Sequence, residues 1–256
     1  MENLNRKRLA IGINPVGELL RSDNPVDRIY VSKNRSAPQI ARLIDKAQKR
    51  DIPIIMSDNM RMDKLCDGAN HQGIIAVCAE IAYCDVDDIL ALARSRTEKP
   101  FVIILDGLKD PHNFGAIIRS ANGAGAHGII VAKRGNAPLS ETVSKTSAGA
   151  LEYARIARVS NLASTIEELK EKGLWIFGTS DKATDTYTNV DFDTPCALII
   201  GDEGFGIGRL LSEKCDFLIN IPMKGQVSSL NASVAAGVVM YEVLRQRDLK
   251  TINGGE

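Results

Sequence analysis

The sequence lacks several features that would assign it to a specialised class of protein. Basic and acidic side chains number 32 each, and aromatic residues make up 5% of the 256 positions. No apolar run approaches the roughly 20 residues needed to cross a bilayer. The first segment, MENLNRKRLAIGINPVGELL, has no apolar core of the kind found in signal peptides. The five cysteines show no CxxC spacing and are odd in number, so we expect free thiols in a reducing cytoplasm.

Familiar nucleotide and metal motifs are also missing or misplaced. There is no GxxxxGK[ST] sequence of a P-loop, and the three histidines have neither HExxH spacing nor a cysteine partner, so we expect no metal site. Residues 123–128 match GxGxxG, but they follow a predicted helix and precede a predicted strand. Because a dinucleotide site needs the opposite order, we interpret this motif as a helix C-terminus with glycine at C′.

The remaining composition is that of a folded globular protein, with 44% apolar and 25% charged residues. Short apolar runs alternate with helical patterns, which predicts an α/β fold with helices covering a parallel sheet. Predicted strands span 28–32, 52–56, 73–79, 101–105, 128–132, 153–159, 174–178, 196–200 and 217–221. Predicted helices lie near 15–22, 36–50, 58–66, 85–96, 114–124, 138–147, 161–173 and 228–247.

A polar, partly helical stretch over residues 81–99 suggests a boundary between two domains. We expect a small α/β domain over 1–80, a linker over 81–99 and a larger domain over 100–256. The zero net charge hides an asymmetry between them, because residues 1–50 contain eleven basic and five acidic side chains. This excess indicates contact with a polyanion, or else a solvated helix face that carries Arg42, Lys46, Lys49 and Arg50.

Polar and glycine-rich loops follow four of the predicted strands, at the edge where open parallel sheets bind ligands. They begin at Asp106, Gly178, Gly201 and Pro222. Each glycine has a simpler interpretation as a turn, Asn113 as a helix N-cap, and Ser228 or Ser229 as the cap of the last helix. Arg119 lies among apolar helix residues, where a buried charge needs a partner, and Glu203 is a candidate for that partner or for a substrate ligand.

At these loops the sequence resembles the SpoU/TrmH family of RNA ribose 2′-O-methyltransferases, within the SPOUT superfamily. Three segments carry the resemblance: DPHNFGAIIRSA (110–121), LIIGDEGFGI (198–207) and INIPMKGQVSSLNASVAAG (219–237). Residues 8–80, with GINPVGELL and HQGIIA, are similar to the RNA-binding domain attached to many members. Within the family, the chain is most similar to members that modify a guanosine in large-subunit ribosomal RNA.

The resemblance implies a catalytic domain with a deep trefoil knot at its C-terminal end, a homodimer packed through the knot, and S-adenosylmethionine as cofactor. The last helix carries a face of small residues that suits close packing against another helix or a second subunit. The resemblance places the cofactor against backbone groups around Gly201, Ile221 and Leu230, with Thr179 nearby. The family's polar functional positions correspond to Asn113, Arg119, Glu203, Ser229 and Asn231.

Two residues depart from the family pattern, Asp202 before the motif glutamate and Ala232 in the third motif. Asp202 adds negative charge near the expected cofactor and is expected to alter its affinity. Arginine is effectively always protonated, so we expect Arg119 to grip a phosphate and stabilise a developing oxyanion rather than to abstract a proton. The alternatives are a transfer-RNA substrate, or an idle RNA-binding ribosome-assembly factor on the same fold.

The charge asymmetry makes a prediction about RNA binding. The affinity of the full chain for RNA should fall steeply with salt, because neutralised phosphates release counterions. Deletion of residues 1–80 should remove this dependence, which titrations of labelled RNA at several salt concentrations would measure. An unchanged salt slope after the deletion would contradict an RNA-binding role for the basic segment.

Overall fold

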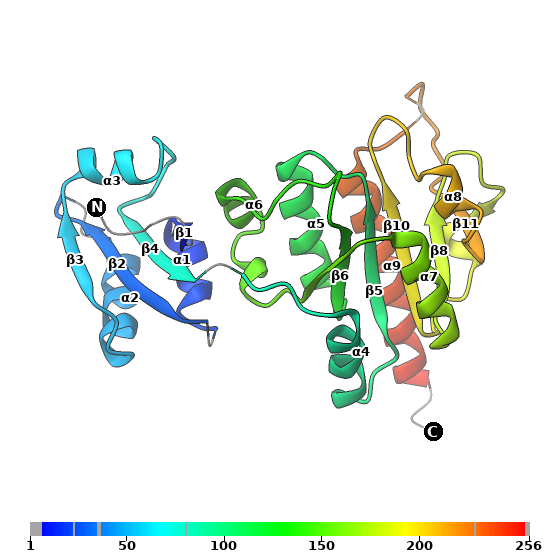
Figure 1. Cartoon of the computed structure of the whole chain (residues 1–256), viewed down its shortest axis with the longest axis horizontal. Helices are drawn as coiled ribbons and strands as arrows, with labels where there is room; N and C mark the ends of the chain where they lie inside the picture. Colours follow the sequence, from blue (N-terminus) through cyan, green and yellow to red (C-terminus); the bar gives the residue numbers. More distant parts are fainter. Residues whose placement is uncertain (1–6, 23, 35–36, 80, 228, 254–256) are drawn as a thin grey trace. The chain divides into compact units, whose positions relative to one another are not determined.

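Strands and helices alternate along the chain, which confirms the predicted α/β class (Figure 1). The structure is a computed structural model, and it describes residues 7–253 except 23, 35, 36, 80 and 228. Contacts divide the chain into two units, which we describe separately. The first unit contains the residues up to Ala82 together with Pro138–Tyr153, and the second contains Tyr83–Ala137 and the chain from Ala154 onward.

The first unit is built on a four-stranded sheet in the order β1-β4-β2-β3, formed by β1 (Lys7–Ile11), β4 (Ile74–Ala79), β2 (Val26–Ser32) and β3 (Ile54–Ser57). Only β2 and β3 are parallel, since β4 runs antiparallel to both β1 and β2. A parallel sheet was therefore the wrong expectation here. Strand β1 was not predicted, because its first two residues, Lys7 and Arg8, are charged and leave only a short apolar run.

Helices cover both faces of this sheet. α1 (Ile13–Leu19) and α2 (Pro38–Lys49) pack on one face, and α3 (Asn59–Leu65) packs on the other. Two of the four basic residues predicted on one helix have structural contacts. Lys49 pairs with Asp45, and the Arg50 guanidinium donates to the carbonyl oxygens of Leu19, Ser22 and Asn24.

A buried ion pair connects β1 to the returning segment Pro138–Tyr153 within the first unit. This segment contains α6 (Glu141–Thr146) and a 3-10 turn, η1 (Ala150–Glu152). Arg8 Nη1 and Nη2 lie 2.7 and 2.8 Å from the two carboxylate oxygens of Glu152, and Nη1 also donates to Ser144 Oγ. Both charged side chains are almost fully buried, so each depends on the other for its compensation.

The second unit contains a seven-stranded sheet in the order β7-β6-β5-β10-β8-β11-β9, and every adjacent pair is parallel. Its strands are β5 (Phe101–Asp106), β6 (Gly128–Ala132), β7 (Ile156–Val159), β8 (Trp175–Thr179), β9 (Asp185–Thr186), β10 (Cys196–Gly201) and β11 (Phe217–Asn220). The two central strands β5 and β10 are buried along their length, as predicted from FVIIL and CALII.

Two sets of helices cover the parallel sheet. α4 (Val86–Ser95), α7 (Leu162–Glu171) and α8 (Arg209–Ser212) share one apolar core with the strands. α5 (Pro111–Gly123) packs against α9 (Ala232–Asn253), and α9 also contacts β10 and a short 3-10 turn, η2 (Tyr187–Asn189). Because strand side chains alternate, α9 lies on the face opposite the α4 core.

The GxGxxG segment forms the end of α5, as interpreted from the sequence. The helix ends at Gly123 with Ala124 as C-cap, and Gly125 follows at C′ with φ of 74°. The Ala126 amide donates to Ala121 O and the Gly125 amide to Asn122 O, the bond pattern of a Schellman motif. This segment is therefore a helix stop and not a dinucleotide site.

The two units differ from the expected domain bounds in two places. α4, which we assigned to a polar linker over 81–99, buries Ile89 and Leu90 in the core of the second unit. Residues 138–153, which we assigned to the larger domain, group with the first unit. Among the described residues, no helix is long and apolar enough to span a membrane.

The Arg8–Glu152 pair predicts a large effect on stability. Replacing Arg8 with Met should lower the free energy of unfolding of the first unit by about 3–5 kcal/mol, because it leaves a buried, uncompensated carboxylate. Urea denaturation would measure the change. The exposed Lys49–Asp45 pair is a matched control, and Lys49→Ala should cost no more than about 1 kcal/mol. Equal effects of the two substitutions would contradict this account.

Candidate functional site

Four neighbouring strands end at the same edge of the parallel sheet and place the candidate residues there. β5, β10, β8 and β11 are adjacent in the sheet and run in parallel. Their last residues are Asp106, Gly201, Thr179 and Asn220. The loops after β5 and β11 lead directly into α5 and α9, so the N-termini of these two helices follow the same edge.

The Asn231 side chain hydrogen bonds to two other predicted site residues, Asn113 and Glu203. Its Oδ1 accepts the backbone amides of Ser233 and Val234 at 3.0 and 3.3 Å, so Asn231 caps α9. Its Nδ2 donates to Asn113 Oδ1 at 3.0 Å and to Glu203 Oε1 at 3.4 Å. Because the amide oxygen faces the helix, the nitrogen must face the other two side chains.

Asn113 is buried in the first turn of α5 and is not its N-cap. The cap is Asp110, whose carboxylate accepts the backbone amide of His112 at 2.9 Å. A hydrogen bond from the Asn113 side chain, together with the His112 amide, lowers the pKa of Asp110 below its usual value. Asn113 therefore links the cap of one helix to the cap of the other, which a simple capping role does not require.

The loop between β10 and α8 is folded tightly on itself. Asp202 and Gly206 exchange both backbone hydrogen bonds, at 3.1 and 2.8 Å, and Asp202 Oδ1 accepts the amides of Gly204 and Phe205. Asp106 Oδ2 accepts the Gly208 amide at 2.8 Å. The carboxylate of Asp202, which we expected to act on a cofactor through its charge, thus hydrogen bonds within its own loop.

Arg119 differs most from its expected environment. It lies on α5 but is exposed to solvent, so the argument that its charge is buried and needs a partner was wrong. Within the described part of the chain it forms no ion pair with Glu203, which is also exposed. The reason is helical geometry, since buried Ile117 and Ile118 face the core while the next residue projects outward.

Ser229 and the four expected cofactor residues lie on the same loops. Ser229 and Leu230 are exposed just before α9, Ile221 is half-buried, and Gly201 is buried at the end of β10. Thr179 Oγ1 donates to the carbonyl oxygen of Ile199 at 3.4 Å. Three adjacent strands therefore bring these five positions to one edge. The capping role suggested for Ser229 belongs to Asn231, and Ser228 lies outside the described residues.

Asn220, at the end of β11, was not among the predicted site residues. Its Nδ2 donates to the carbonyl oxygen of Ala183 at 2.5 Å, while its Oδ1 is buried and has no hydrogen-bond partner among the described residues. A buried acceptor without a partner costs free energy, so this oxygen is suited to a donor group on a ligand. Its position as the last residue of an apolar strand was the available signal.

Exposed cations surround this edge of the sheet. Each of the loops after β5, β6, β8 and β11 carries at least one exposed basic side chain with no ion pair among the described residues; these are Lys109, Lys133, Arg134, Lys182 and Lys224. The basic character expected from residues 1–50 is therefore not confined to the first unit. An anionic chain bound at this edge would meet favourable charge on several loops.

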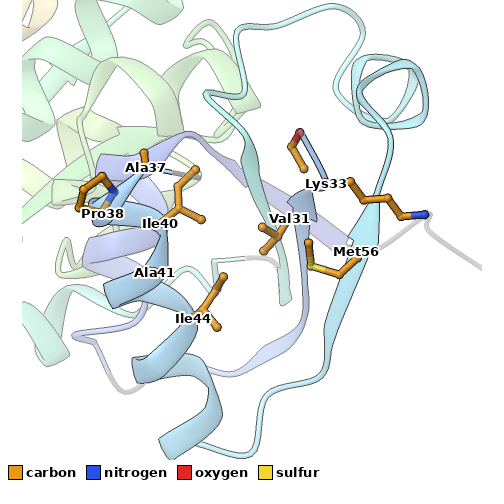
Figure 2. A pocket seen from close by; sticks show the side chains of 9 residues that line it. Val31, Lys33, Ala37, Pro38, Ile40, Ala41, Ile44 and Met56 are labelled. Atoms are coloured by element: carbon orange, nitrogen blue, oxygen red, sulfur yellow. The ribbon is translucent and has the colours of Figure 1, made fainter. Parts of the chain in front are cut away.

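The first unit has a separate apolar groove of about 460 Å³ between α2 and the edge of its sheet (Figure 2). Ile40, Ala41 and Ile44 contribute from α2, and Val31 and Met56 contribute from the strands. Lys33 is the charged residue of the lining. The groove lies in the unit expected to contact RNA.

The cysteines and the possible metal-ligating groups bear on two of the sequence expectations. All five cysteines are free, and burial raises the pKa of Cys78, Cys196 and Cys215 to about 11, so these thiols are protonated near neutral pH. No group of three His, Cys, Asp or Glu side chains able to hold a metal ion occurs in the described ranges.

Comparisons with known proteins identify relatives of both parts of the chain. A model of the SpoU rRNA Methylase family matches residues 100–241, and a model described as RNA 2′-O ribose methyltransferase substrate binding matches 9–84. YacO of Bacillus subtilis, which bears the name of a TrmH family tRNA/rRNA methyltransferase, is 47% identical over 239 residues, covering 93% of this chain and 96% of the relative.

Solved structures agree with this relationship. The SpoU methyltransferase AviRb of Streptomyces viridochromogenes is similar with a TM-score of 0.81 at 26% identity, covering 98% of this chain and 91% of that one. A second structure of AviRb, in complex with the cofactor AdoMet, gives a TM-score of 0.78 at 27% identity over 95% and 91% of the two chains.

The tight loop after β10 makes a testable prediction. A Cβ atom on Gly201 would lie 2.1 Å from the backbone carbon of Gly206, so Gly201→Ala must displace the loop. We expect a loss of about 1–3 kcal/mol in stability and faster hydrogen exchange at the Asp202 and Gly206 amides. Gly225→Ala is the control, because a Cβ atom added there would meet nothing within 4 Å. Slow exchange in the Gly201 variant would contradict the predicted clash.

Proposed function

The chain belongs to the SpoU rRNA methylase family of RNA methyltransferases, and on this premise we propose that it transfers a methyl group from S-adenosylmethionine to a ribose 2′-hydroxyl of RNA. The observation that carries the proposal is the hydrogen-bonded set Asn113, Glu203 and Asn231. These residues come from three sequence segments that end at one sheet edge. Their meeting there is what a single polar site requires.

The cofactor proposal rests on the loops after β8, β10 and β11. We propose that S-adenosylmethionine is held by Thr179, Gly201, Ile221 and Leu230. Oδ1 of Asn220, which has no partner in the described part of the chain, offers an acceptor for one of the cofactor's donor groups. The solved AviRb complex with AdoMet supports this choice of cofactor. When bound, the sulfonium supplies an activated methyl group, so the transfer needs no metal ion.

The difficult partner in the reaction is the nucleophile, because a ribose 2′-hydroxyl is a very weak acid that must lose its proton as it attacks. The exposed guanidinium of Arg119 is free to bind an RNA phosphate and to stabilise negative charge on the attacking oxygen. Glu203, Ser229 and Asn231 would orient the ribose. The exposed carboxylate of Glu203 is a hydrogen-bond acceptor within this set, and the proton that the hydroxyl releases would pass through it to solvent while the sulfur leaves with the pair of the broken S–C bond.

We propose ribosomal RNA as the substrate, with a guanosine of the large subunit as the target. Support comes from the RNA substrate-binding match over 9–84 and from the basic residues of the first unit. The name of YacO includes both transfer and ribosomal RNA, so transfer RNA is the rival substrate. Because the second unit also carries exposed cations, we revise the expectation that deletion of residues 1–80 removes the salt dependence of RNA binding: the deletion should reduce the salt slope without abolishing it.

We further propose a homodimer that packs through α9, in a domain whose C-terminal part forms a trefoil knot. The exposed Val234 and Tyr241 lie seven residues apart on one face of α9, with half-buried Gly237 and Val238 between them. An apolar face with small residues in its centre suits close packing of a second copy. The proposed location is the cytoplasm, which fits an RNA substrate and five free cysteines.

Labelled cofactor and separate pools of unmodified ribosomal and transfer RNA test the substrate. We expect label in the ribosomal pool, and nuclease mapping of the labelled RNA would identify the nucleotide and its 2′-O-methyl group. Label in transfer RNA alone would reassign the substrate. RNA binding without any transfer of label would favour the idle assembly factor.

Arg119→Ala should abolish most methyl transfer while cofactor binding survives. We expect kcat to fall by a factor on the order of 100–1,000, the usual effect of removing one donor that stabilises an oxyanion. Calorimetry with S-adenosylmethionine would check that cofactor affinity is kept. Arg134→Ala removes another exposed cation from the same sheet edge and should leave kcat unchanged.

Near-normal turnover of the Arg119 variant would end this assignment. A pH–rate profile tests the alternative role of Arg119 as a base. A profile governed by a strongly shifted titration that disappears in the Arg119 variant would favour proton abstraction over phosphate binding.

A further inference from the structure

Phe205 is an aromatic side chain that the fold leaves almost entirely in solvent. It is 93% exposed, more than any other large apolar residue among those described. It gains almost nothing from burial, and a polar residue at the same position would serve the loop equally well. Its exposure is therefore a feature that folding does not explain.

The loop that carries Phe205 holds its backbone in one place. The Phe205 amide donates to Asp202 Oδ1 at 3.3 Å. Phe205 also lies between Asp202 and Gly206, which close the loop by exchanging two backbone hydrogen bonds. Gly204 and Gly206 have no side chains that could cover the ring. A ring on a fixed backbone has only two side-chain torsions to restrict, so binding against it costs little conformational entropy.

The surroundings of Phe205 indicate what binds there. Glu203, two residues earlier, accepts a hydrogen bond from Asn231 in the proposed site. Exposed lysines stand on the loops after the neighbouring strands, at Lys109, Lys182 and Lys224. An exposed apolar ring at the same sheet edge as exposed cations is a combination that binds unpaired nucleotides, with the base stacked on the ring and the phosphates near the cations.

We propose that Phe205 is a stacking platform for an unpaired base of the substrate RNA. This inference rests on the proposed function, since it makes Phe205 a residue that positions RNA for methyl transfer. The face of the ring meets the face of a base, a contact that every base can make, so Phe205 contributes affinity and placement. The polar residues of the site and the first unit select the nucleotide.

Substitutions at Phe205 separate stacking from a general apolar contact. Phe205→Leu keeps apolar volume but removes the ring, and Phe205→Trp enlarges the ring. With unmodified ribosomal RNA as substrate, we expect the Leu variant to raise the KM for RNA by roughly 5- to 150-fold, the range for loss of one base stack. The Trp variant should keep the wild-type KM, and both should bind S-adenosylmethionine as the wild type does.

Trp175 provides a matched control, because it is also an exposed aromatic residue of the same sheet but lies at the start of β8, at the opposite edge. Trp175→Leu should leave the KM for RNA unchanged. A wild-type KM in Phe205→Leu would overturn the proposal. So would a changed oligomeric state in that variant by light scattering, because Phe205 would then contact a second copy of the chain.

Fluorescence tests stacking without turnover. Trp175 is the single tryptophan, so the double variant Trp175→Phe, Phe205→Trp carries its only indole at the platform. Single-stranded RNA oligonucleotides should quench its emission, and an absence of quenching would overturn the proposal. Quenching in a protein that methylates no RNA would support the stacking platform and reject the proposed function. Methyl transfer without quenching would support the proposed function and reject the platform.

Discussion

The capping of α9 by Asn231 is the interaction on which the candidate site depends. The first amides of a helix have no partners within it, and the Asn231 oxygen satisfies two of them. This fixes the direction of the side-chain nitrogen, which reaches Asn113, 118 residues earlier in the chain, and Glu203. A requirement of helix formation thus sets the geometry of a polar cluster drawn from distant segments.

The carboxylates at this sheet edge divide into two kinds. Asp106, Asp110 and Asp202 each accept backbone amides of nearby loops or helix ends. Such bonds hold the loops in place, and at Asp110 the hydrogen bonds also lower the pKa of the carboxyl. Glu203 instead has one long contact to a side chain and is exposed to solvent. It therefore remains available to a substrate.

The same distinction applies to the basic residues. Arg8 is buried against Glu152, and Arg50 donates to three carbonyl oxygens, so both serve the folding of the first unit. The excess of positive charge near the N-terminus is therefore partly structural. Exposed lysines and arginines also lie on the loops of the parallel sheet, where we propose that they help to attract RNA. Charge counted along a sequence cannot separate these roles, because burial and partners decide them.

Local patterns determined much of this protein. Apolar runs predicted the central strands β5 and β10, the GxGxxG segment was correctly interpreted as a helix stop, and the three motifs indicated the family. These features depend on neighbours within a few residues, which a sequence displays directly. Other features depended on pairing between distant segments: the mixed sheet of the first unit, strand β1 and the grouping of residues 138–153 with that unit. Arg8, for example, can be buried in β1 only because Glu152 compensates its charge. The solvent exposure of Arg119 and Phe205 was likewise decided only by the tertiary structure. So was the hydrogen-bonded set of Asn113, Glu203 and Asn231, because strand ends meet only in the assembled sheet.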